Sequence, residues 1–114
     1  MRDDIRKLVE EQIAALADED WYNRSAAAEV LGSLGHEAAP AVDALIAALA
    51  DEEGAVDWDA AKALVRVGEA AVPKLESVPP DTRAGWFARK VLHRIAPERF
   101  AAPEGDVPPG PAKS

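Results

Sequence analysis

The chain has no cysteine, only two histidines and few aromatic side chains among its 114 residues. Without cysteine it can form neither disulfide bonds nor thiolate metal sites, and its composition is compatible with a reducing cytosol. No apolar run approaches the roughly 18 residues that a membrane-spanning helix needs. The N-terminal stretch MRDDIRKLVEE is too charged for a signal peptide. We therefore expect a cytoplasmic protein that does not contact membranes.

Residue patterns that carry catalysis or hold a cofactor are also missing. His36 and His93 lie far apart in the sequence, and neither has a second histidine at the spacing of metal ligands. We expect both histidines at the solvent-exposed surface. The serines have no glycine elbow or neighbouring base, and no phosphate-binding glycine loop is present. The sequence predicts no catalytic, cofactor-binding or metal site, and therefore a protein without enzymatic activity.

Positive charge is scarce, since 13 Lys and Arg stand against 21 Asp and Glu and leave a net charge of −8. Affinity for nucleic acid rests largely on cations that neutralise phosphates, so nucleic-acid binding is disfavoured. The charge is uneven: residues 1–80 carry 7 basic and 17 acidic side chains, or −10, whereas residues 81–114 carry 6 and 4, or +2. This asymmetry favours a basic partner that binds the acidic N-terminal part, or head-to-tail association of two copies of the chain. Solvated helix surface is the simpler explanation of the same charges.

What the sequence does contain is an internal repeat. The block AAAEVLGSLGHEAAPAV, residues 26–42, returns 33 residues later as AAKALVRVGEAAVPKL. Gly35 then corresponds to Gly68, and Pro40 corresponds to Pro73. A repeated helical unit of this length predicts an α-solenoid, in which each helix buries its apolar side by stacking on its neighbours.

Apolar spacing, capping residues and prolines predict six helices. Asp18 and Asp20 are suited to cap the second helix and Asp81 the sixth. The helices are expected over residues 2–17, 21–34, 38–50, 56–67, 70–77 and 82–96. Residues 101–114 contain four Pro and two Gly with almost no large apolar side chains, which indicates a flexible tail. The expected fold is all-α, a short solenoid of about six helices over residues 1–100 with a disordered Pro/Gly-rich tail at 101–114.

The string NRSAAAEVLGSLG at 23–35, flanked by DED and AAPAVDALIAAL, resembles the short HEAT-like repeat of the phycobilisome-lyase type. Positions that match the family pattern are Arg24, Ala27, Ala28, Leu31, Gly32, Leu34 and Gly35, then Val56, Ala60, Ala61, Leu64, Val67 and Gly68 in the second copy. The resemblance covers about residues 5–96. It implies a stack of helical hairpins, and such repeats occur in scaffolds, adaptors, regulatory subunits and a few lyase subunits.

Departures from the family pattern are informative too. Asp57 stands where the repeat has Arg, so we do not expect the family's ladder of stacked Arg–Asp contacts to continue beyond Arg24. The acidic turns at 18–20 and 51–53 are equivalent in the two copies. Their expected role is helix capping, and an acidic ridge for a basic partner segment is the functional alternative.

The resemblance also places the candidate binding surface. In arrays of this family the second, or B, helix of each hairpin lines the concave surface, so the helices at 2–17, 38–50 and 70–77 should face any groove. Candidates for its floor are Lys7, Glu10, Glu11, Asp43, Ala44, Ala47, Lys74 and Glu76.

Two tryptophans suggest a second surface. Trp58 points about 200° away from Val56 on a helical wheel, and Trp86 holds the equivalent place 28 residues later. Both would form an exposed aromatic patch of the kind that anchors interfaces, or each packs over the flank of the adjacent helix. Basic side chains follow Trp86 on the same predicted helix: Arg89, Lys90, His93 and Arg94. This basic–aromatic stripe suits an acidic partner, a nucleic-acid backbone or the acidic front of another copy of the chain.

The sequence thus predicts a non-catalytic protein-interaction module that binds another protein through its B-helix face or the tryptophan patch. The first alternative is an accessory subunit of an enzyme, such as a bilin-lyase-type chromophore chaperone, which rests on family analogy alone. A nucleic-acid-binding helical repeat is the third, disfavoured by charge. We expect no cofactor, and a monomer or weak self-association.

Overall fold

The computed structural model describes residues 2–109, and within them the chain is helical without any strand. Two of the helices, η1 and η2, are short 3₁₀ segments. The elements are α1 (Asp3–Ala15), α2 (Trp21–Ser33), η1 (Gly35–Ala41), α3 (Val42–Ala48), α4 (Gly54–Val67), η2 (Gly68–Ala71), α5 (Val72–Glu76) and α6 (Arg83–Ile95). The predicted all-α class is confirmed. None of these helices combines the length and the apolarity that crossing a bilayer would require.

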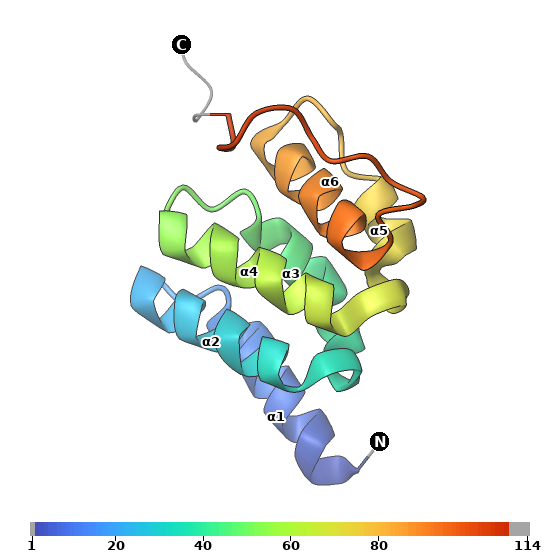
Figure 1. Ribbon diagram of the computed structural model, residues 1–114. Helices are drawn as coiled ribbons and strands as arrows, with labels where there is room; N and C mark the ends of the chain where they lie inside the picture. The colour runs from blue at the N-terminus through green and yellow to red at the C-terminus, as the bar shows by residue number, and fades with distance from the viewer. Residues whose placement is uncertain (1, 110–114) are drawn as a thin grey trace.

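The helices form two layers. Figure 1 shows α2, α4 and α6 stacked side by side towards the viewer, with α1, α3 and α5 behind them. We call the outer surface of α2, α4 and α6 the A face, and that of α1, α3 and α5 the B face. The chain climbs the stack from α1 to α6, so the predicted helical solenoid is confirmed.

Local chemistry explains where the helices begin and end. The Asp20 carboxylate accepts the N–H of Tyr22 at 3.0 Å and caps α2, as predicted. Gly68 ends α4 with a φ of 84°, a left-handed conformation that glycine adopts without strain. The cap predicted for the sixth helix is wrong by one residue, since the Thr82 hydroxyl, and not Asp81, accepts the N–H of Gly85 at 2.9 Å.

The two prolines of the repeat alter the start of the B helices. The helix predicted from residue 38 is a 3₁₀ turn up to Ala41 and becomes α-helical only at Val42. Pro40 has no N–H to donate, so regular α-helical hydrogen bonding is established only after it. Pro73, by contrast, lies in the first turn of α5, where a missing N–H costs nothing.

Small side chains let the neighbouring helices α2 and α4 of the A-face layer approach closely. Ala28 on α2 and Ala60 on α4 are fully buried, and a Cβ added at Gly32 would lie 3.3 Å from the Ala63 Cα. Around this contact, the equivalent leucines Leu31 and Leu64 are both fully buried. The repeated sequence therefore produces a tightly packed interior in which α2 and α4 stack closely.

The segment after α6 has no helix but makes defined contacts. The Trp86 indole Nε1 donates to the Glu104 carbonyl at 2.9 Å, and the Arg83 guanidinium donates to the Pro109 carbonyl at 2.8 Å. Figure 1 shows this segment running back along α6. The domain boundary after residue 100 and the flexibility of the residues beyond it stay predictions, and residues 110–114 lie outside the described part of the chain.

Candidate functional site

Two ion pairs tie successive A-face helices to each other. The Arg24 Nε donates to the Asp51 carboxylate at 2.7 Å, which links the start of α2 to the turn before α4. The Arg83 Nη2 donates to the Asp57 carboxylate at 2.6 Å, which links α6 to α4. We expected the ladder of Arg–Asp contacts to stop at Asp57, and this second pair corrects that expectation. In the first pair the earlier helix supplies the arginine, whereas in the second pair the earlier helix supplies the aspartate.

Asp57 is fully buried, and its Oδ1 has no hydrogen-bond partner among the described residues. Burial raises the pKa of Asp57, because the charged form loses its hydration, and the Arg83 guanidinium opposes that rise. Only one oxygen of the Asp57 carboxylate is hydrogen-bonded by a side chain, and its charge is therefore stabilised by a single cation, the Arg83 guanidinium. We assign this carboxylate to the stability of the stack and not to binding.

The acidic turns are also used structurally. Asp18 accepts hydrogen bonds from the Asp20 N–H and the Asn23 amide, and these donors lower the pKa of Asp18. Asp51 accepts the N–H of Glu53 in addition to its bond with Arg24. Over residues 2–109, no three His, Asp or Glu side chains are grouped as a metal ion would require. The aspartates of these turns, Asp18, Asp20 and Asp51, are engaged in turn and cap hydrogen bonds and in an ion pair.

The tryptophans pack against each other. The ring centroids of Trp58 and Trp86 lie 6.0 Å apart, and Phe87 contacts both rings edge to face. Trp86 is only 4% exposed, and its indole N–H binds the Glu104 carbonyl of the C-terminal segment. Of the two alternatives that the sequence left open, the structure therefore shows packing against the adjacent helix, and the exposed aromatic patch is wrong. The helical wheel shows on which side of the helix Trp86 lies, but it cannot show that the C-terminal segment covers this side chain.

The basic stripe expected on α6 is divided between two surfaces. His93 is half-buried, and its Nδ1–H donates to the Phe100 carbonyl at 2.8 Å, so its expected exposure is also corrected. Arg89 lines a cavity of about 280 Å³ together with Arg99 and Phe100. Other cations of the stripe lie on the opposite flank of α6: Lys90 packs over the two tryptophan rings, and Arg94 faces α4.

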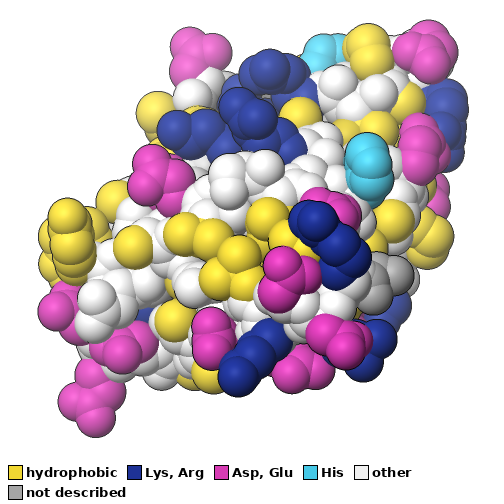
Figure 2. All heavy atoms as spheres, turned by 90° about the horizontal axis from the view of Figure 1, so that it is seen from below, with side chains coloured by type: hydrophobic (Ala, Val, Ile, Leu, Met, Phe, Trp, Pro, Cys, Tyr) yellow, Lys and Arg dark blue, Asp and Glu magenta, His cyan; other side chains and the backbone are white. Residues whose placement is uncertain are grey.

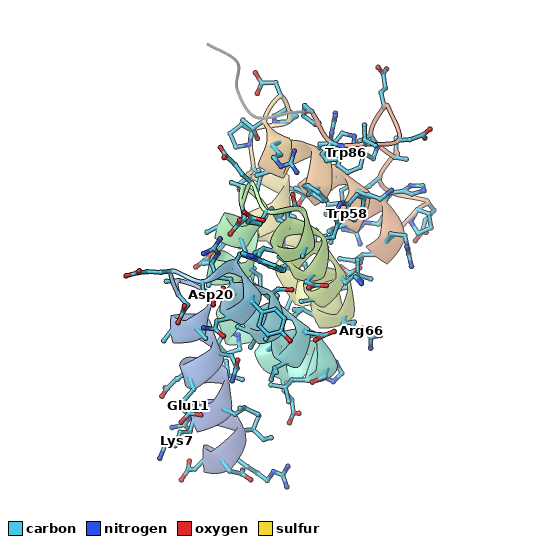
Figure 3. All side chains as sticks on the ribbon, turned by 90° about the vertical axis from the view of Figure 1, so that its left-hand side faces the viewer. Lys7, Glu11, Asp20, Trp58, Arg66 and Trp86 are labelled. Atoms are coloured by element: carbon cyan, nitrogen blue, oxygen red, sulfur yellow. The ribbon has the colours of Figure 1, made fainter. Side chains whose placement is uncertain are left out.

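The B face carries the predicted floor residues at its surface. Lys7 and Glu11 are exposed on α1 and, as Figure 3 shows, lie on the opposite side of the molecule from Arg66. Asp43 is exposed and accepts two hydrogen bonds from the Lys74 ammonium, at 2.9 and 3.1 Å, which tie α3 to α5. The predicted residues thus share a face, and two of them partly neutralise each other.

A shallow cavity opens between α1 and α3. It has a volume of about 300 Å³, and its lining is mainly apolar with many alanine side chains: Ile13, Leu16, Ala17, Ala44, Ala47, Ala48, Ala50 and Asp51. We call it the α1–α3 hollow. The sequence predicted Ala44 and Ala47 here, but not the residues of α1 and the turns, whose register against α3 depends on how the layers stack.

Electrostatics give the hollow a negative character. The C-terminal ends of α1 and α3 both reach it, and neither helix has a basic residue in its last turn. A helix C-terminus carries a partial negative charge, which a basic side chain in the last turn would normally offset. The hollow therefore combines an apolar floor with two helix C-termini that have no basic residue of their own.

Comparison with families of known proteins identifies a repeat family. A family model described as HEAT repeats matches residues 9–90, from within α1 into α6. Neither the curated proteins nor the solved structures contain a significant match to this chain.

Proposed function

This chain belongs to the HEAT-repeat family, and from that premise we propose that it is a non-catalytic interaction module whose α1–α3 hollow binds a basic segment of a partner protein. HEAT repeats commonly mediate protein–protein interactions and typically serve as scaffolds without catalysis. The observation that supports this site is the alanine-lined hollow at two helix C-termini that lack basic residues.

The shape of the hollow suits a Lys or Arg side chain. Such a side chain has an aliphatic stem that can lie on alanine methyl groups, and a cationic head that stays near water. At its rim Asp51 supplies a carboxylate, although Arg24 already pairs with it. The helix C-termini would then stabilise the partner's cation as they would a basic residue in their own last turn.

The surrounding surface favours the same sign of partner. Residues 1–80, which include α1 and α3, carry the −10 that gives the chain its negative balance. On the B face, Glu11 is exposed near Lys7, and Asp43 is paired with Lys74. Long-range attraction would therefore bring a basic segment to this end of the molecule, with a rate that falls as salt is added.

A peptide-display selection against the immobilised protein tests the proposal. Enriched sequences should contain a Lys or Arg next to apolar residues. Their affinity should fall at least about tenfold in Ala47→Arg, which fills the hollow with the chain's own cation. The control is Ala26→Arg, the same change at an exposed alanine of α2. Failure to enrich basic peptides, or equal losses in both variants, would contradict the proposal.

No observation favours the chromophore-chaperone alternative. Four cavities on the described part of the chain have volumes of about 270 to 300 Å³. Such volumes lie at the lower limit of the range for small-molecule sites, about 300–1,000 Å³. The protein-interaction proposal needs no enclosed pocket.

A further inference from the structure

The A face carries a ladder of cations that runs across two helices. Positions 28 residues apart stand side by side on α4 and α6, as the contact between Trp58 and Trp86 shows. The next positions along both helices are basic: Lys62 and Arg66 on α4, and Lys90 and Arg94 on α6. Residues at i and i+4 share one face of a helix, so the four cations form two adjacent rows.

Three of these cations share one cavity. Lys62, Arg66 and Arg94 line a hollow of about 290 Å³ together with Val65. We call this cavity, extended by Lys90, the basic groove. Figure 2 shows several Lys and Arg side chains gathered in a cluster on the surface, with other basic and acidic side chains scattered over the remainder of the view.

The first repeat does not continue the ladder. The residues of α2 that precede Lys62 and Arg66 by 33 positions are Glu29 and Ser33, and these four side chains line the neighbouring cavity of about 270 Å³. The positive surface therefore ends at α4, and an acidic side chain borders it on the α2 side.

Few carboxylates of the chain compensate the cations of the groove, and Lys90 is stabilised instead by the Trp58 and Trp86 rings, whose centroids lie 5.9 and 5.3 Å from its ammonium. Within residues 2–109, Arg66, Lys90 and Arg94 form no ion pair, and Lys62 reaches Asp59 only at 3.7 Å from a side chain that is 74% exposed. Acidic residues outnumber basic ones, 21 to 13, so acids to pair with are plentiful in this chain. Like charges four residues apart on a helix repel each other, and here this occurs on both helices. An external anion would relieve that repulsion.

We propose that the basic groove binds an acidic helix of a partner protein. Carboxylates at i and i+4 of such a helix lie about 6 Å apart along its axis, the same rise that separates Lys62 from Arg66 and Lys90 from Arg94. Val65 supplies an apolar contact between the rows. Nucleic acid suits the groove less well, because a long polyanion would have to pass Glu29 and a molecule of net charge −8.

This site is independent of the α1–α3 hollow. The hollow lies on the B face and attracts cations, whereas the basic groove lies on the A face and attracts carboxylates. The protein would then hold partners of opposite charge on its two sides.

Fluorescence anisotropy tests the proposal directly. The probe is a labelled alanine-based peptide of about 18 residues, long enough to be helical, with glutamates at i and i+4 spacing. It should bind the full-length protein with an affinity that falls as salt rises. Arg66→Glu/Arg94→Glu should weaken binding at least about tenfold. The matched control, Arg2→Glu/Arg6→Glu, changes the net charge equally at the start of α1 and should bind within about twofold of the wild type.

Several results would overturn the proposal. These are no binding at low salt, equal losses in the two double variants, or equal affinity for a peptide with lysines in place of the glutamates. Tighter binding of duplex DNA than of the peptide would assign the groove to nucleic acid. Self-association in ultracentrifugation that disappears in Arg66→Glu/Arg94→Glu would assign it to a second copy. Circular dichroism of each variant establishes that the loss does not come from unfolding.

Discussion

Removing Arg83 should strongly destabilise the fold, because it leaves the Asp57 carboxylate buried and alone. The two side chains meet at 2.6 Å, Asp57 is fully buried, and the Arg83 side chain is 18% exposed. Breaking a buried ion pair from one side costs about 3–5 kcal/mol. We expect about 3 kcal/mol for Arg83→Met, since water can enter the partly exposed space that the guanidinium leaves.

The loss should depend on pH in a defined direction. Burial already raises the pKa of Asp57 above its ordinary value of 3.8, and Arg83 opposes that rise. A raised folded-state pKa contributes stability that is complete below the unfolded pKa and is lost as pH rises through the folded value. Arg83→Met raises the folded pKa further. The gap in unfolding free energy between wild type and variant should therefore be small near about pH 4 and widen towards neutral pH.

Urea unfolding followed by circular dichroism measures these differences, with two control variants. Asp57→Leu/Arg83→Met removes both charges and should recover most of the loss, since an apolar pair of similar volume replaces a buried ion pair at little cost. Lys74→Met breaks the exposed Asp43–Lys74 pair and should cost less than about 1 kcal/mol. A loss below about 1 kcal/mol for Arg83→Met at neutral pH would refute the reasoning.

Gly85→Ala and Trp86→Phe test the packing around α6, and Gly54→Ala on α4 is the control for the first of them. A Cβ at Gly85 would lie 2.0 Å from the Pro79 carbonyl oxygen, so Gly85→Ala should destabilise by at least about 2 kcal/mol. Gly54→Ala, where a Cβ meets nothing within 4 Å, should leave the unfolding free energy unchanged or raise it by up to about 1 kcal/mol. Trp86→Phe removes the bond to the Glu104 carbonyl; it should cost about 1 kcal/mol and speed hydrogen exchange in the C-terminal segment. Unchanged exchange would show that this bond does not hold the segment.

The fold could be predicted from the sequence because the repeat is most regular at the positions that form the core. Buried leucines and helix-ending glycines recur at a fixed offset, and each has a direct local consequence in the structure: Leu31 and Leu64 pack in the interior, and Gly35 and Gly68 adopt positive φ angles. Local capping rules identified Asp20 correctly. They failed at Asp81, because adjacent residues both have capping side chains and only the backbone geometry selects Thr82.

The sites were harder to predict because they depend on contacts between distant segments. At Asp57 the sequence suggested only that the arginine of the repeat is missing. The structure shows that Arg83, 26 residues later, forms an ion pair with this aspartate. The helical wheel left Trp86 open between exposure and packing, because it contains no sign of the chain that returns over α6. Lys62 and Arg66 were missed as a site, although their spacing from Trp58 recurs at Trp86, because their joint cavity exists only when α4 and α6 stack.

The most direct test of the proposed function is a two-dimensional NMR titration of the protein with a basic peptide from the display selection. We expect the largest chemical-shift changes on residues of the α1–α3 hollow, with Ile13, Ala44 and Ala47 among them, and we expect these changes to vanish in Ala47→Arg. Changes concentrated on α2, α4 and α6, or shifts that persist in Ala47→Arg, would contradict the proposed function.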